Sequence, residues 1–190
     1  TSFASREDAI AYARRLDAVI DRLERVRAAT IAQVQGVATG AGCAIALACD
    51  LRVWTPEARF GMPIARTLGN CLSAANYARM MDAIGAARVK DLLFTGRLVD
   101  ATEAASFGLV NRVVEAHDLE TTVRAMASTI AANAPLTIRA TKEAVRRIQA
   151  ARRLAPDGTD DLVATCYLSE DFKEGVASFL AKRSPRFRGI

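Results

Sequence analysis

Apolar and polar residues follow two different periods along this chain, and the change of period predicts its architecture. Over residues 9–26, apolar positions recur every three or four residues, which is typical of one face of a helix. Ser5 is placed to cap the start of that helix, with Asp8 three residues later. Residues 30–35 and 51–54 then form short apolar runs, which predict two buried strands, and Val37 is expected to contribute to the first. We therefore expect a helix that leads directly into a small sheet.

Three glycines and a helix of small or aliphatic residues lie between these two strands. Gly36, Gly40 and Gly42 supply a turn, and Cys43–Cys49 is a helix that can be buried on every side. A glycine-flanked helix start inside a packed protein exposes unpaired backbone N–H groups. Those donors can bind a phosphate, or a carbonyl oxygen that becomes negative during a reaction. The alternative is a packed crossover in which glycine only permits a close approach of the backbone.

The C-terminal half of the chain has a helical pattern almost throughout. We therefore predict that residues 1–115 form part of an α/β core and that residues 116–190 form a helical region. Gly85 separates two of the expected helices, and Pro135 fits the first position of another. The expected elements here are helices 70–83, 86–95 and 101–107, a strand at 109–114, and helices 117–133, 135–154, 160–169 and 170–183.

Composition narrows the class of protein. Hydrophobic residues make up 51% of the 190 positions and charged residues 25%, which is the balance of a soluble globular chain. No apolar run approaches the roughly 20 residues of a membrane span. The four cysteines lack a CxxC spacing and the only histidine, His117, has no obvious partner, so we expect no metal site and reduced thiols in a cytoplasmic protein.

The net charge of +5 raises the question of a nucleic-acid partner. Many of the basic residues follow the helical spacing of residues 139–153, which favours a solvated helix face. A nucleic-acid surface would require interleaved aromatic residues or a recognisable module, and the sequence has neither. We therefore expect neither nucleic acid nor a membrane as a partner, whereas an anionic ligand would use only one or two of these charges.

A series of short motifs, in order, carries a resemblance that covers nearly the whole chain. The motifs are Ala38–Ala44, Ala48–Asp50, Phe60–Pro63, Leu93–Arg97, Gly108–Val114 and Phe179–Phe187. In this order the chain resembles the crotonase (enoyl-CoA hydratase/isomerase) superfamily. Its members carry a strand, a turn of three glycines followed by Cys-Glu, and a helix that ends Ala-Cys-Asp. The resemblance implies an α/β fold with a ββα spiral core, followed by a C-terminal helical region used in trimerisation.

The resemblance also implies an assembly and a longer chain. Crotonase-like proteins form homotrimers or hexamers, and their chains usually carry a further N-terminal α/β segment. That segment supplies the first oxyanion donor and several acyl-CoA contacts. Three expected strands are a thin sheet for so much apolar surface, so we expect a truncated, processed or incompletely represented polypeptide.

The chemistry that the resemblance implies begins with an acyl-CoA thioester. Its carbonyl oxygen lies between two backbone N–H groups, which stabilise an enolate. By position, the second donor is the N–H of Ala41, and losing such a donor typically costs about 3–4 kcal/mol. The alternative for Ala41 is a small packing residue. Coenzyme A is part of the substrate, and no separate cofactor is implied.

Two positions depart from the pattern of hydratases. Those enzymes carry one glutamate directly after the Gly-Gly-Gly-Cys run and another after Phe-Gly-x-Pro, where this chain has Ala44 and Ile64. Neither side chain transfers a proton, and general acid–base groups contribute roughly 10² to 10⁴-fold each. We therefore expect the standard hydratase route to be impaired.

The segment after Ile64 contains the candidates for a replacement group. Arg66, Asn70, Cys71 and Ser73 are candidates to face the acyl group. Asn70 or Ser73 can hold a water molecule but is a poor base without a partner, and Cys71 is a nucleophile only with a lowered pKa. The alternative is that Asn70 and Ser73 cap a helix and that Cys71 is buried.

The C-terminal motif supplies the last candidates. Phe179 and Lys182 match family positions that contact the adenine end of coenzyme A, often from a neighbouring subunit. The alternative for Phe179 is packing in the trimer contact. We expect Asp50 to have a structural role and His117 to lie at the surface.

Together these expectations describe an enoyl-CoA hydratase/isomerase-family protein of fatty acid metabolism. We expect it to bind acyl-CoA thioesters and to stabilise an enolate as a lyase or isomerase. One alternative is an acyl-CoA-binding homologue without catalysis. Another is a structural or assembly protein that uses the basic helical surface.

Overall fold

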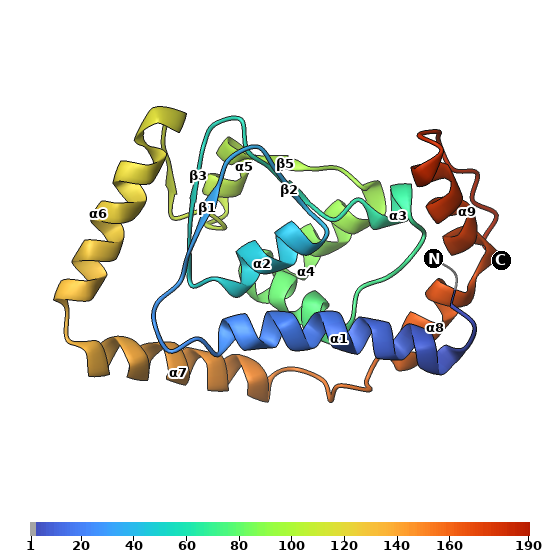
Figure 1. Ribbon diagram of the computed structural model, residues 1–190, viewed down its shortest axis with the longest axis horizontal. Helices are drawn as coiled ribbons and strands as arrows, with labels where there is room; N and C mark the ends of the chain where they lie inside the picture. The colour runs from blue at the N-terminus through green and yellow to red at the C-terminus, as the bar shows by residue number, and fades with distance from the viewer. Residues whose placement is uncertain (1–2) are drawn as a thin grey trace.

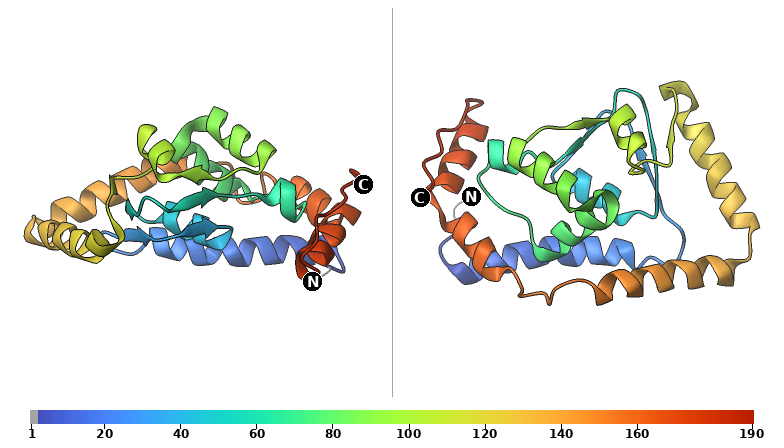
Figure 2. Two further views of the ribbon diagram at one scale, coloured as in Figure 1. Left: turned by 90° about the horizontal axis from the view of Figure 1, so that it is seen from above. Right: turned by 180° about the vertical axis from the view of Figure 1, so that it is seen from behind.

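The computed structural model describes residues 3–190, which form an α/β body framed by long helices (Figure 1). The strands are β1 (Ile31–Val34), β2 (Val37–Thr39), β3 (Leu51–Trp54), β4 (Arg59–Gly61), β5 (Val99–Asp100) and β6 (Arg112–Val113). The helices are α1 (Arg6–Glu24), α2 (Ala41–Ala48), α3 (Ile64–Thr67), α4 (Ala74–Thr95), α5 (Ala101–Ser106), the 3-10 helix η1 (Ala116–Asp118), α6 (Leu119–Ala132), α7 (Pro135–Ala151), α8 (Asp160–Leu168) and α9 (Glu170–Leu180). Helix α6 and the α8–α9 pair lie at opposite ends of the molecule, with α1 between them (Figures 1 and 2).

The strands form two three-stranded sheets rather than the single thin sheet that the sequence predicted. One sheet has the order β1-β3-β6 with parallel pairs, and the other has the order β2-β4-β5. The strand expected at residues 30–35 is confirmed as β1, but the assignment of Val37 to the same strand is wrong, because the chain breaks at Gly36, whose φ of 79° lies in the left-handed region. Val37 therefore belongs to β2, which pairs with β4 in the second sheet.

Several other boundaries differ from the sequence predictions. Helix α2 begins at Ala41 instead of Cys43, and the short helix α3 was not predicted. Helix α4 begins at Ala74 instead of residue 70, because the Ser73 side chain accepts a hydrogen bond from Asn76 N and caps it there. The break at Gly85 is confirmed, with φ 76° inside α4. Strands β4 and β5, of three and two residues, were missed.

Helix α2 lies inside the main hydrophobic core. Four of its eight residues are buried, and they pack in one cluster with Trp54 and Phe60, both fully buried. The rings of Trp54 and Phe60 have centroids 5.5 Å apart. Small residues let α2 approach its neighbours closely, which is why the helix can sit beside both sheets.

A second, aromatic cluster joins the start of α1 to the last two helices. The cluster joins Phe3 and Tyr12 with Tyr167 of α8 and Phe172 of α9, and the ring centroids of its neighbouring pairs are 4.9 to 6.1 Å apart. Aromatic side chains bury large areas, so this cluster holds the C-terminal helices to the body.

Helix α9 also closes on the loop that follows α3. A Cβ atom on Gly175 would lie 2.3 Å from the carbonyl oxygen of Leu68, so the helix and the loop touch backbone to backbone. A Cβ on Gly69 would meet the backbone of Asp171 and the ring of Phe187. The absence of side chains at these glycines sets the distance between α9 and the α3–α4 loop.

None of the helices within residues 3–190 combines the length and the apolar composition that crossing a bilayer requires.

Candidate functional site

The first turn of α2 is an exposed set of backbone donors. Gly40 precedes it with φ 54°, and the first cap bond runs from Ala44 N to Gly40 O at 3.1 Å. Within residues 3–190, no side chain caps this helix end, and both Ala41 and Gly42 are exposed. The Ala41 N–H therefore lies at a helix start, where it can donate a hydrogen bond to an oxygen atom of a bound molecule.

The two positions without glutamate are buried beside this helix. Ala44 and Ile64 are 6% and 9% exposed and belong to the same apolar cluster. The neighbouring thiol of Cys43 is fully buried, and burial raises its pKa well above the usual value. The surroundings of α2 in this direction are therefore apolar.

Arg66 lies on the exposed side of α3. Its Cβ packs so closely on Gly96 that a Cβ there would be 2.7 Å away. Gly96 ends α4 in the left-handed conformation, with φ 63°. The contact fixes the stem of Arg66 two residues from Ile64, with the side chain at the surface.

Asn70, Cys71 and Ser73 face α1 and α8. Asn70 Nδ2 donates to Tyr167 Oη at 3.0 Å, and Cys71 Sγ lies 3.5 Å from Leu162 O. Ser73 caps α4 and donates from Oγ to Asp17 Oδ1 at 2.7 Å. The structure therefore places these three candidates, which lie between α3 and α4, against helices α1 and α8.

Asp17 is a polar partner that sequence reasoning missed. It also accepts from Asn76 Nδ2 at 2.9 Å, so its carboxylate bridges α1 to the start of α4. Burial raises the pKa of Asp17, although the Ser73 hydrogen bond opposes that rise. In the sequence, Asp17 follows Leu16 and therefore lies at the edge of the apolar face of α1. That position does not identify Ser73 as its partner.

Phe179 and Lys182 come together at the end of α9. The Phe179 ring is 68% exposed and Lys182 is also exposed, with φ 51° directly after the helix. Arg183, next in the chain, is instead held by an ion pair to Glu174 at 2.6 Å. The two residues thus present an aromatic face and an ammonium group at the surface.

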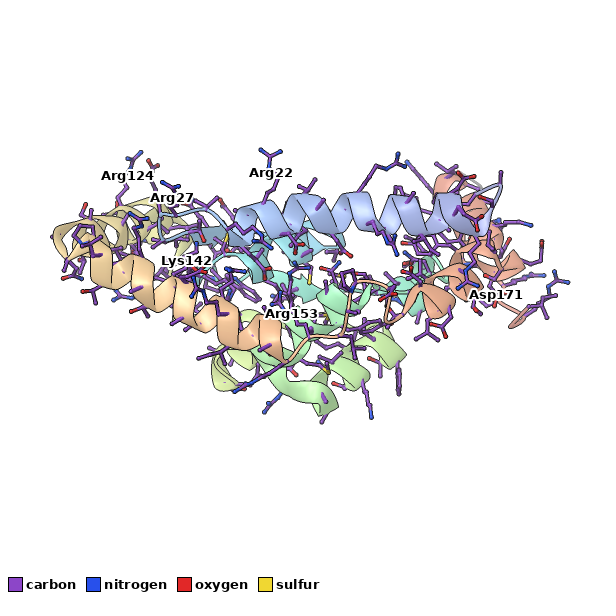
Figure 3. All side chains as sticks on the ribbon, turned by 90° about the horizontal axis from the view of Figure 1, so that it is seen from below. Arg22, Arg27, Arg124, Lys142, Arg153 and Asp171 are labelled. Carbon is purple, nitrogen blue, oxygen red and sulfur yellow. The ribbon has the colours of Figure 1, made fainter. Side chains whose placement is uncertain are left out.

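Asp50 has a structural environment. Its Oδ2 accepts from Thr30 N at 2.7 Å and from Lys142 Nζ at 2.7 Å, so it ties the start of β1 to α7. Lys142 of α7 and Arg153, which follows this helix, both lie where α7 meets the body (Figure 3). A cavity of about 450 Å³ lies there, lined by charged and apolar side chains including Glu24, Arg79 and Arg153. It adjoins residues 47–52 at the C-terminal end of α2, whereas Ala41 begins that helix.

Known proteins match this chain over most of its length. The sequence model of the enoyl-CoA hydratase/isomerase family matches residues 3–189. A Mycobacterium bovis protein named "Probable enoyl-CoA hydratase" is 41% identical over 169 residues, which cover 87% of this chain and 65% of that protein. The short-chain-enoyl-CoA hydratase of Clostridium acetobutylicum is 36% identical, covering 87% of this chain and 63% of that protein. The chain therefore spans less than two thirds of the length of these curated relatives.

Solved structures show the same fold. Methylmalonyl-CoA decarboxylase in complex with 2-nitronate-propionyl-CoA superposes with a TM-score of 0.88 at 28% identity, covering 96% of this chain and 71% of that one. An enoyl-CoA hydratase/carnithine racemase from Magnetospirillum magneticum superposes with a TM-score of 0.74 at 32% identity, covering 100% of this chain and 70% of that one. By its sequence and by its crotonase fold, the chain belongs to the enoyl-CoA hydratase/isomerase family.

Proposed function

We propose that this protein binds acyl-CoA thioesters and stabilises the enolate form of the acyl group through the Ala41 N–H. The observation that carries the proposal is the uncapped, exposed first turn of α2 in a chain of this family. A donor aimed at an oxygen that gains charge during reaction lowers the barrier without moving a proton. Phe179 and Lys182 are proposed to contact the adenine end of coenzyme A in a homotrimer or hexamer.

Hydration of an enoyl-CoA is proposed to be slow. Water addition needs groups that position water and move protons, whereas Ala44 and Ile64 are apolar and buried. Asn70 and Ser73 are already bonded to Tyr167 and Asp17. The site is thus better suited to stabilising an enolate than to creating one by proton abstraction.

Decarboxylation of a 2-carboxyacyl-CoA is a second candidate, favoured by the 0.88 TM-score with methylmalonyl-CoA decarboxylase. In that reaction the bond between the α-carbon and the carboxylate breaks and carbon dioxide leaves. The electron pair passes to the thioester oxygen as an enolate, and water then protonates the α-carbon. No base is needed, and apolar neighbours such as Ile64 disfavour the charged carboxylate relative to neutral carbon dioxide.

Turnover of two thioesters by the same purified protein tests both proposals. We expect crotonyl-CoA hydration at least about 10²-fold below that of ordinary hydratases, and faster hydration in the Ala44→Glu, Ile64→Glu double variant. Carbon dioxide release from methylmalonyl-CoA supports the second candidate. Wild-type hydration at the ordinary rate contradicts the first argument, and acyl-CoA binding without either reaction indicates a binding protein.

The oxyanion donor has its own matched pair of variants. Ala41→Pro removes the N–H, whereas Ala41→Gly keeps it. We expect the proline variant to lose at least about 10²-fold in enolate-dependent turnover and the glycine variant to retain it. A proline variant of unchanged melting temperature and unchanged rate shows that Ala41 is not the donor.

A further inference from the structure

Two of the four cysteines face each other across the contact between the α3–α4 loop and α8. The side chains of Cys71 and Cys166 are close enough for each to shift the pKa of the other. Cys71 Sγ also lies 3.5 Å from the carbonyl oxygen of Leu162, which is one helical turn before Cys166. Both thiols are half-buried and neither is in a disulfide. The two sulfur atoms are therefore neighbours although they are far apart in the sequence.

Hydrogen bonds on both sides of the pair hold the loop against α8. Before Cys71, the amide of Asn70 donates to Tyr167 Oη at 3.0 Å. After it, Ala74 N donates to Thr159 Oγ1 at 3.0 Å, which joins the first residue of α4 to the residue before α8. The pair is thus anchored at each end, so its sulfur atoms stay close without a covalent bond.

From this arrangement we propose that Cys71 and Cys166 are a redox-modification site, whose oxidation forms an intramolecular disulfide between the α3–α4 loop and α8. The reactant is a small peroxide such as hydrogen peroxide. The Cys166 thiolate attacks one peroxide oxygen, the O–O bond breaks, and a sulfenic acid and water result. The Cys71 sulfur then attacks the sulfenic sulfur and forms the S–S bond, and a second water leaves. The two thiols lose two electrons and two protons, and the peroxide is reduced to two waters.

The environment assigns the first attack to Cys166. Interaction with the neighbouring Cys71 thiol lowers the pKa of Cys166, which favours its thiolate form. The same interaction and burial raise the pKa of Cys71 well above its usual value, which suits the thiol that attacks second. Cys43 is fully buried in the core, so an oxidant in solution does not reach it, whereas Cys71 and Cys166 are only half-buried.

The disulfide would fasten the C-terminal helices to the loop that follows Ile64 and Arg66. Helix α9 already touches this loop at Leu68, through the space left by Gly175. A crosslink from the adjacent Cys71 to α8 therefore restricts both partners of that contact. It also closes a long chain loop, which disfavours the unfolded state.

Peptide mapping after mild oxidation tests the proposal directly. Trypsin places Cys71 on peptide 67–79, Cys166 on peptide 154–173, and Cys43 and Cys49 together on peptide 28–52. After treatment of the folded protein with hydrogen peroxide, we expect peptides 67–79 and 154–173 to be joined and to separate on reduction. The oxidised protein should migrate as a monomer on a non-reducing gel and melt about 5 °C or more above the reduced protein.

Matched variants distinguish this site from general oxidation. Cys166→Ser and Cys71→Ser should each abolish the crosslink and the rise in melting temperature. Cys49→Ser, a half-buried cysteine outside the pair, should retain both. A crosslink only between molecules, a crosslink to peptide 28–52, or irreversible oxidation of Cys166 with Cys71 left reduced would each overturn the proposal.

Discussion

Helices α2 and α7 are held in the fold by opposite means. Four of the eight residues of α2 are buried, and the helix contains no charged side chain. Helix α7 is 17 residues long, and none of its residues is buried. Its contact with the body depends on ion pairs, of Lys142 with Asp50 at 2.7 Å and, just after the helix, of Arg153 with Glu24 at 3.1 Å.

The two helices differ in whether contacts within this chain cover their apolar side chains. Burial of apolar surface fixes α2, and with it the donors at Ala41, independently of any partner. Helix α7 instead leaves Leu136, Val145 and Ile148 between 49% and 74% exposed. Large exposed apolar side chains in a row are typical of surfaces that another molecule covers, which fits the proposed trimer.

The largest expected effect comes from a substitution in the hydrophobic core around α2. Phe60→Ala removes a fully buried ring that packs at a tilt against Trp54, and it should lower the free energy of unfolding by about 3–5 kcal/mol. Urea unfolding monitored by circular dichroism measures the change. Phe94→Ala is the control, because that ring is 79% exposed, and it should change stability by less than about 0.5 kcal/mol. Equal effects of the two variants would contradict the assigned core.

A smaller effect, dependent on pH, is expected at Glu24. Burial alone would raise the pKa of its carboxyl, but hydrogen bonds from Arg79 and Arg153 outweigh burial and lower the pKa below 4.5. A lowered pKa in the folded state means stabilisation that is fully present above pH 4.5 and is lost as the pH falls through the folded value. Glu24→Gln should therefore cost about 1.5–3 kcal/mol at pH 7.

Acid titration of stability separates this explanation from a loss of packing. The difference between Glu24→Gln and the wild type should shrink as the pH falls from 4.5 through the lowered pKa of the folded carboxyl, because the wild-type carboxyl becomes protonated over that range. A difference that stays constant from pH 7 to pH 3 would show that charge is not the cause.

Removing the ion pair at the start of the α7 contact should have a moderate effect. Lys142→Met keeps most of the apolar stem but loses the bonds from Nζ to Asp50 Oδ2 and to Ala28 O, at 2.7 and 3.0 Å. We expect a loss of about 1–2 kcal/mol, since Asp50 keeps its bonds to Thr30. Hydrogen exchange should increase in α7 while α2 stays protected. Uniform loss of protection would show that α7 is not a separate unit.

The smallest effect is expected at the exposed end of α7. Leu136→Ala should change the stability of dilute protein by less than about 0.5 kcal/mol, because this side chain is 74% exposed. Sedimentation velocity at micromolar concentration tests whether the same variant weakens a trimer. Stability that falls by more than about 1 kcal/mol in the dilute monomer would contradict the exposure of this face.

Local sequence signals predicted the long helices well. The cap at Ser5 is confirmed by its hydrogen bond from Asp8 N at 3.1 Å, and the break at Gly85 by its left-handed φ. Both depend on residues within a few positions of one another. Strands β4 and β5 were missed because two or three residues contain too little periodicity, and only pairing across the sheet makes them strands.

The candidate functional site shows the same limit of prediction from local sequence. The glycine-rich start of α2 could be predicted, since turn and helix are consecutive in the chain. The partners of Ser73 and Cys71 could not, because Asp17 and Cys166 are brought to them by the packing of α1 and α8. Single-sequence patterns do not encode which distant side chains meet.

Gly175 sets the distance between α9 and the loop that follows α3. With hydrogen in place of a side chain, α9 rests on the Leu68 carbonyl, where a methyl carbon would lie only 2.3 Å away. Alanine, serine and valine at position 175 would therefore push the helix away from the loop by increasing amounts as the side chain becomes larger. Because Leu68 directly follows α3, which begins with Ile64, such a series would show how far a displacement at the C-terminal helices is transmitted toward the acyl end of the proposed pocket.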